Sequence, residues 1–198
     1  PEGEIHSRSA GSTPREMGKD NSKYPYDRIF AAADLATMRG ADQLPAVKKL
    51  LQDSDSAVRY WGAVGILNRG AAAIKASEKE LLAALQDDSS YVRIAAGYAF
   101  GKYGSQAQQR KGIDALVGVA PWKNNSDVFV SMAALNAIDK LDQKAGYALE
   151  TIRRFPTSGG VSPDGRYNKY VARILGKTVQ DLGSGEPSSE KKKKRKKK

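Results

Sequence analysis

Cysteine is absent from this chain of 198 residues, and histidine occurs only once, at position 6. Without cysteine the chain has no disulfide framework, no thiolate zinc site and no cysteine nucleophile. This absence fits reducing and oxidising surroundings equally, so it leaves the compartment open. No apolar run approaches the ~18 residues that a membrane span requires. The sequence also contains no Gly-rich phosphate loop and no metal-ligand spacing pattern, so the common catalytic motifs are missing.

Positive charge is abundant, but most of it lies at one end of the sequence. The formal net charge is +11, and residues 191–198 contribute eight of these charges, which leaves +3 for everything else. Electrostatic arguments about partners therefore concern the tail more than the folded surface. The residues of this tail are Lys191, Lys192, Lys193, Lys194, Arg195, Lys196, Lys197 and Lys198.

A flexible polycation attracts every polyanion, so this tail is a candidate site for anionic lipid, nucleic acid or sulfated polysaccharide. It could also serve as a nuclear import signal if the source were eukaryotic. No aromatic residue alternates with the lysines, so base stacking is not expected. A solubilising extension without a specific partner is an equally weighted alternative.

Composition divides the chain into three regions. Residues 1–25 are rich in Gly, Ser, Pro and charge, which predicts an irregular lead-in segment. Residues 26–182 follow helical periodicity, and residues 183–198 are predicted to form a disordered linker and the Lys/Arg tail. The chain begins with proline instead of methionine, which we expect of a processed product or a fragment.

The helical region repeats itself. Residues 53–66 match residues 87–100 at an offset of 34, and residues 125–138 form a more distant copy a further 38 residues on. Each copy contains a helix-capping residue that predicts a helix start, at Asp55, Ser89 or Asp127. A shorter amphipathic helix is predicted before each of these helices. We therefore predict an all-α right-handed solenoid of about nine helices, in which residues 56–70 and 90–103 form neighbouring parallel helices.

Small residues recur on one face of the longer helices. There they would let the backbones of stacked helices approach each other closely. The residues concerned are Gly62, Gly65, Ala95, Ala96, Ala99, Ala133, Ala134 and Ala137.

Pairs of antiparallel helices that repeat every 34 to 38 residues, with an Asp on the turn and an Arg six residues later, resemble the HEAT repeat. This resemblance implies that Asp53, Arg59, Asp87 and Arg93 form a ladder of charge-assisted hydrogen bonds between neighbouring units. In the third copy the acid is replaced by Asn125 and the Arg by Ser131, so the ladder would end there.

A set of longer sequence segments is more specific than the HEAT pattern. Residues 1–18 (PEGEIHSRSAGSTPREMG), the Tyr-Pro at 24–25, residues 56–62 (SAVRYWG) and residues 92–96 (VRIAA) resemble the C-terminal region of bacterial sulfatases related to heparan N-sulfatase. The resemblance extends from residue 1 to about residue 182 and excludes the tail. It implies a non-catalytic scaffold or interaction module that follows a sulfatase catalytic domain in the same polypeptide. The parent protein would be periplasmic or secreted and would act on sulfated glycans.

The catalytic chemistry of sulfatases does not carry over to this chain. Those enzymes use a formylglycine, made in a Cys/Ser-x-Pro-x-Arg motif, beside a calcium ion. The nearest string here, residues 12–15 (STPR), lacks the residue between Pro and Arg. The resemblance therefore implies no catalytic residue, metal site or cofactor in this chain, while calcium and formylglycine belong to the parent's catalytic domain.

Four polar residues near the start of the chain are candidates for docking on that catalytic domain. They are Glu4, His6, Arg8 and Arg15. For His6, a plain surface or docking position is the favoured interpretation, since it has no partner for a triad nearby in the sequence. An alternative for the whole chain is a free-standing adaptor, whose concave solenoid face binds a protein and whose tail binds a polyanion.

Overall fold

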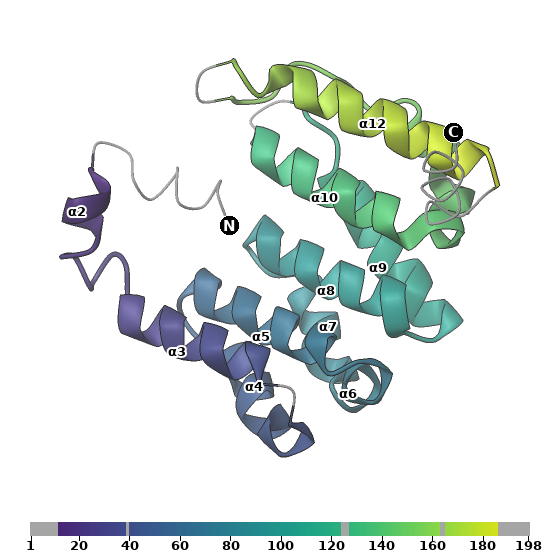
Figure 1. Ribbon diagram of the computed structural model, residues 1–198. Coiled ribbons are helices and arrows are strands. Elements are labelled where there is room, and N and C mark those ends of the chain that lie inside the picture. The colour runs from purple at the N-terminus through teal and green to yellow at the C-terminus, as the bar shows by residue number, and fades with distance from the viewer. Residues whose placement is uncertain (1–11, 39, 124–126, 163–164, 186–198) are drawn as a thin grey trace, which may run out of the picture.

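The computed structural model describes residues 12–38, 40–123, 127–162 and 165–185 of the chain (Figure 1). These residues form helices and connecting loops without any strand, apart from one isolated bridge between Asp127 and Val161. The prediction of an all-α protein is therefore confirmed. In this part of the chain no helix combines the length and the apolar character needed to cross a membrane.

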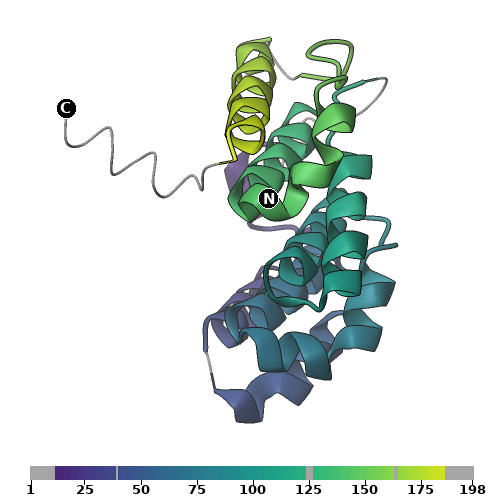
Figure 2. The ribbon, with the colours of Figure 1, turned by 90° about the vertical axis from the view of Figure 1, so that its right-hand side faces the viewer.

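Long helices form a single row (Figure 1). Each helix of the row packs against the next one in chain order. Figure 2 shows the row from the side, with its first helix near the bottom and its last helix at the top. The helices of the row are α3 (Tyr26–Thr37), α5 (Ser56–Asn68), α8 (Ser90–Tyr103), α10 (Val128–Leu141) and α12 (Asn168–Gly183).

Contacts at both ends of these helices show that neighbours run in the same direction. Near the N-termini of α3 and α5, Arg28 Nη2 lies 3.4 Å from Asp53 Oδ1. Near their C-termini, a Cβ built on Gly65 would lie 3.1 Å from the Cα of Ala36. Small residues at these crossings allow the backbones to approach, as their recurrence in the sequence predicts.

A second set of helices, which we call the connecting helices, joins the members of the row and packs behind them. α9 runs antiparallel to α8 after the turn at Gly104, and α4 packs against α5 in the same way. These elements are η1 (Ala41–Gln43), α4 (Leu44–Leu50), α6 (Ala71–Ala76), α7 (Glu78–Ala84), α9 (Gln106–Val119), η2 (Asp142–Ala148) and α11 (Leu149–Ile152).

The predicted start signals of two long helices act as N-caps. Asp55 accepts a hydrogen bond from the backbone N–H of Ala57 at 2.8 Å, and Asp127 accepts one from Phe129 at 2.7 Å. These bonds satisfy amides that have no partner within the helix. Ser89 occupies the N-cap position of α8, and its backbone N–H donates to the Asp87 carboxylate at 2.8 Å.

Two details differ from the sequence prediction. From Tyr26 to Gly183 the described residues contain ten α-helices instead of about nine, because the segment before α8 breaks at Ser77 into α6 and α7. The lead-in is also not irregular throughout, since Pro14–Met17 form one helical turn, α2. Thr13 and Glu16 cap this turn reciprocally: Thr13 N donates to Glu16 Oε2 at 2.7 Å, and Glu16 N donates to Thr13 Oγ1 at 3.3 Å.

Candidate functional site

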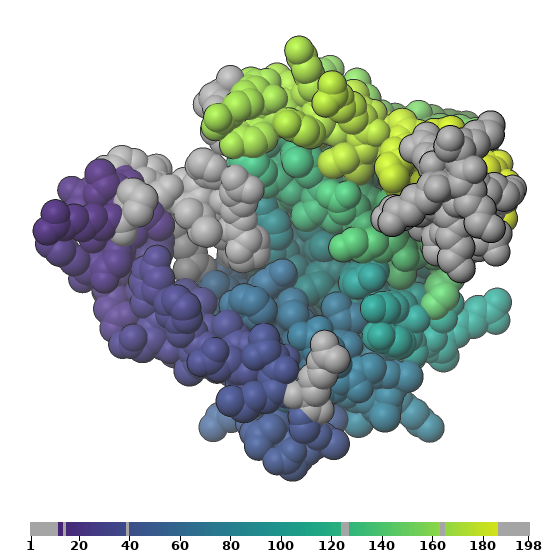
Figure 3. All heavy atoms as spheres, viewed as in Figure 1, coloured from purple at the N-terminus to yellow at the C-terminus, as the bar shows by residue number. Residues whose placement is uncertain are grey.

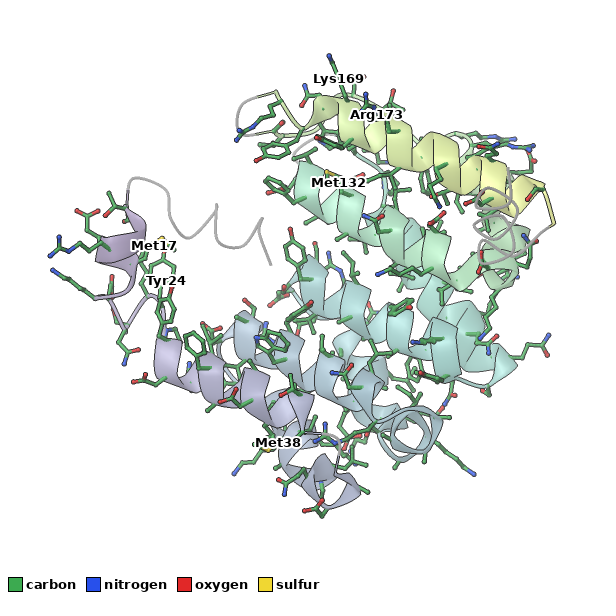
Figure 4. The ribbon with its side chains drawn as sticks, in the orientation of Figure 1. Met17, Tyr24, Met38, Met132, Lys169 and Arg173 are labelled. Atoms are coloured by element: carbon green, nitrogen blue, oxygen red, sulfur yellow. The ribbon has the colours of Figure 1, made fainter. Side chains whose placement is uncertain are left out.

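Among the described residues, a groove of about 450 Å³ runs along α8, between α5 and α10. We call it the α8 groove. Its lining comes from α5, α8 and α10 and includes Met132, whose position on α10 is labelled in Figure 4. The larger and charged side chains of its lining are Tyr60, Tyr91, Tyr98, Phe129, Met132 and Lys140.

The α8 groove is shallow and mostly apolar because small and buried side chains form its floor. Tyr91, Ile94 and Ala95 of α8 are each less than a tenth exposed, whereas Tyr60 and Met132 on the flanking helices are half-buried and form the walls. Burial raises the pKa of the Tyr60 phenol, so this hydroxyl stays protonated at neutral pH. It is thus available as a hydrogen-bond donor and acceptor beside apolar surface.

One end of the α8 groove is positively charged. Lys140 lines the groove near the C-terminus of α10, and Lys102 Nζ lies 5.7 Å from the ring centre of Tyr98 and 4.9 Å from that of Tyr103. Neither lysine forms an ion pair with another residue of the described ranges. A ligand that carries a carboxylate at this end would therefore gain a favourable charge interaction.

The titratable side chains that line the α8 groove are three tyrosines and one lysine. Among the described residues that line it there is no carboxylate, histidine, serine or cysteine. In the same ranges, no cluster of three or more such metal-ligating side chains could hold a metal ion. The arrangement is suited to binding an apolar or aromatic segment.

Two residues of the predicted ladder meet at the N-terminal edge of the row. Arg59 donates to Asp87 through Nε at 2.7 Å and through Nη2 at 2.9 Å, a bidentate pair that joins the first turn of α5 to the turn before α8. Burial by itself would raise the pKa of Asp87, but hydrogen bonds from Arg59 and from the Ser89 amide keep this pKa below its usual value.

The other two ladder residues have different partners. Asp53 pairs with Arg28 of α3, which the sequence analysis did not include. Arg93 donates to the backbone carbonyl of Asp87 at 2.6 Å and to Ser90 Oγ at 2.8 Å, so it stabilises the turn of its own unit. Asn125 lies outside the described residues. Ser131 is buried and donates to the carbonyl of Ala120 at 2.5 Å.

A second set of contacts joins the units at the C-terminal edge of the row, and sequence reasoning missed it. Arg69 donates through Nη2 to the Leu35 carbonyl at 3.1 Å, and Lys144 Nζ donates to the Lys102 carbonyl at 2.8 Å. These cations bind the last carbonyls of α3 and α8, which have no partner within the helix. No local sequence signal identifies such pairs, because the partners are 34 and 42 residues apart.

Of the predicted docking residues, only Arg15 lies within the described ranges, where it is exposed on α2. Glu4, His6 and Arg8 lie outside these ranges. The same is true of the whole Lys/Arg tail at 191–198.

Comparison with models of known protein families gives no match to this chain, and comparison with curated proteins gives none either. The kinship with sulfatases therefore stays a prediction from the sequence.

Proposed function

We propose that this chain is a non-catalytic interaction module, a right-handed helical-repeat solenoid of the HEAT type that holds a partner in the α8 groove. The α8 groove is the observation that carries the proposal, because three neighbouring helices contribute to it and its lining is aromatic and apolar. The bidentate contact between Arg59 and Asp87, which links successive units as HEAT ladders do, supports the repeat assignment.

The resemblance to sulfatases suggests which partner this is. We propose a sulfatase catalytic domain upstream in the same polypeptide, so that the module stabilises or extends that domain in a periplasmic or secreted enzyme for sulfated glycans. Calcium and formylglycine would belong to the catalytic domain. The Lys/Arg tail would add unselective affinity for sulfated polysaccharide or another polyanion.

A free-standing adaptor is the second candidate. The open α8 groove with its cationic end favours it, since such a surface can accept a segment of a separate protein as readily as one of the same chain. The gene separates the two candidates. An upstream Cys/Ser-x-Pro-x-Arg motif in the same reading frame supports the sulfatase, and its absence contradicts that candidate while leaving the interaction module intact.

Site-specific crosslinking tests whether the α8 groove holds the partner. A photoreactive benzophenone amino acid would replace Met132 in the full-length protein, and the crosslinked peptides would be mapped by mass spectrometry. The matched control places the same group at Lys75, which is exposed on α6 and does not line the α8 groove. We expect crosslinks to the catalytic domain from position 132 only. Equal yields from both positions would contradict a role of the groove.

A further inference from the structure

The first helix of the row exposes an apolar face. On and directly after α3, the side chains of Phe30, Met38 and Tyr26 are 60%, 56% and 42% exposed. The rings of Tyr26 and Phe30 stack with their centres 5.7 Å apart, which makes one continuous apolar surface. Within the row α3 packs only on α5, so its other side has no neighbour in the row. Clustered exposed side chains of this size are typical of an interaction surface.

This apolar surface carries negative charge. Asp27 and Asp34 are exposed on the same side of α3, seven residues or two helical turns apart. Neither forms an ion pair with another described residue. We refer to Tyr26, Asp27, Phe30, Asp34 and Met38 as the α3 face.

The last helix of the row has the opposite character. Figure 4 shows Lys169 and Arg173 on the outer side of α12, pointing away from α10. Ala172 and Gly176 are exposed on the same side, and no atom lies within 4 Å of the place where a Cβ on Gly176 would be. We refer to Lys169, Ala172, Arg173 and Gly176 as the α12 face. Lys169 and Arg173 form no ion pair within the described ranges.

The two faces lie at opposite ends of the molecule (Figures 1 and 3). We infer that copies of this chain associate end to end, with the α3 face of one copy on the α12 face of the next. The carboxylates of Asp27 and Asp34 would meet the cations of Lys169 and Arg173. The small side chains of the α12 face would leave room for Phe30.

Charge also decides between this arrangement and a symmetric dimer. Two α3 faces brought together would oppose the carboxylates of both copies, and two α12 faces would oppose their cations. The end-to-end contact instead places a further helix on the row, in the manner in which α12 already lies on α10. Such a contact joins two different surfaces and leaves both outer ends free, so it can continue beyond two copies.

Sedimentation velocity of the full chain over a range of concentrations, at an ionic strength of ~0.15 M, tests this inference. We expect the wild type to form a concentration-dependent series of species. Phe30→Lys places a positive charge in the α3 face, and Arg173→Glu places a negative charge in the α12 face. Each variant alone should associate about tenfold more weakly or not at all. Lys75→Glu, away from both faces, is the charge control and should behave as the wild type.

The decisive sample is a mixture of the two variants. Phe30→Lys keeps an intact α12 face and Arg173→Glu keeps an intact α3 face, so together they should associate more strongly than either variant does alone. Far-UV circular dichroism of each variant checks that it is folded. A wild type that stays monomeric at all concentrations, or a mixture that stays monomeric while the wild type associates, would overturn the inference. Neither result bears on the α8 groove, which is a separate surface.

Discussion

Replacing Gly112 by alanine should destabilise the protein, whereas the same replacement at Gly118, in the same helix, should not. A Cβ at position 112 would lie 2.5 Å from the Gly97 carbonyl oxygen, 2.8 Å from the Phe100 Cβ and 3.1 Å from the Gly101 nitrogen. Most of these neighbours are backbone atoms of α8, which cannot rotate away as the end of a flexible side chain can. The two helices would have to separate where they cross.

The expected size of the effect follows from two opposing terms. Overpacking a well-packed interior costs typically about 1–3 kcal/mol, and a clash with backbone places Gly112→Ala near the upper end. Alanine recovers about 0.5–1 kcal/mol, because it has the higher helix propensity. The net loss should therefore be about 2 kcal/mol of unfolding free energy, which corresponds to a melting temperature lower by roughly 4–8 °C for a chain of this size.

Urea and thermal unfolding followed by far-UV circular dichroism measure this loss. At Gly118 no atom lies within 4 Å of the place where the methyl group of alanine would be, so Gly118→Ala gains helix propensity without a clash. It should be about 0.5–1 kcal/mol more stable than the wild type. If Gly112→Ala unfolds at the same urea concentration as the wild type, the close crossing of α8 and α9 is refuted.

Four further predictions concern single contacts and the tail. Arg59→Ala should lower the unfolding free energy by about 2 kcal/mol in urea titrations, since it leaves the half-buried Asp87 carboxylate without its cation. Folding lowers the pKa of Asp87, so the stabilisation from its carboxylate is present above about pH 4 and is lost as the pH falls through the folded pKa. Asp87→Asn should therefore lose less stability in acid than the wild type does. An unchanged dependence of stability on pH would contradict this. Thr178→Val should leave stability unchanged or raise it by up to about 1 kcal/mol, since the buried Thr178 hydroxyl has no hydrogen-bond partner among the described residues, and a clear loss would reveal a missed partner. Deleting residues 191–198 should reduce retention on heparin at low salt, and unchanged retention would exclude the tail as the polyanion site.

Features encoded within a few residues were readable from the sequence. Helical periodicity and recurring small residues identified the long helices, and Asp55 and Asp127 marked two of their starts. The turn at Pro14–Met17 was equally readable, since Thr13 and Glu16 have the spacing of a capping box, but the surrounding Gly, Ser and Pro concealed it. In all these cases the hydrogen bonds join residues at most one helical turn apart, so the local sequence specifies them.

Contacts between units depended on the tertiary structure. The sequence named Arg59 and Asp87 as ladder residues, but the pairing of Asp53 with Arg28 and the separate role of Arg93 depend on how each helix is rotated and shifted against the next. The packing of the entire row sets those rotations, and no single segment does. The α8 groove has the same origin, because its walls come from α5 and α10, which are separated by four other helices in the chain.

The two ends of the row show most clearly which features follow from the local sequence and which depend on the tertiary structure. Amphipathic periodicity identifies α3 and α12 as helices with a buried side, but it does not reveal which apolar or charged residues remain uncovered once all neighbours are in place. Phe30 is an apolar residue of the predicted helical region, yet it is 60% exposed, because α3 has a neighbour in the row on one side only. Burial is a property of the assembled stack, so the sequence alone determined the helices, and only their packing decided which surfaces are left for partners.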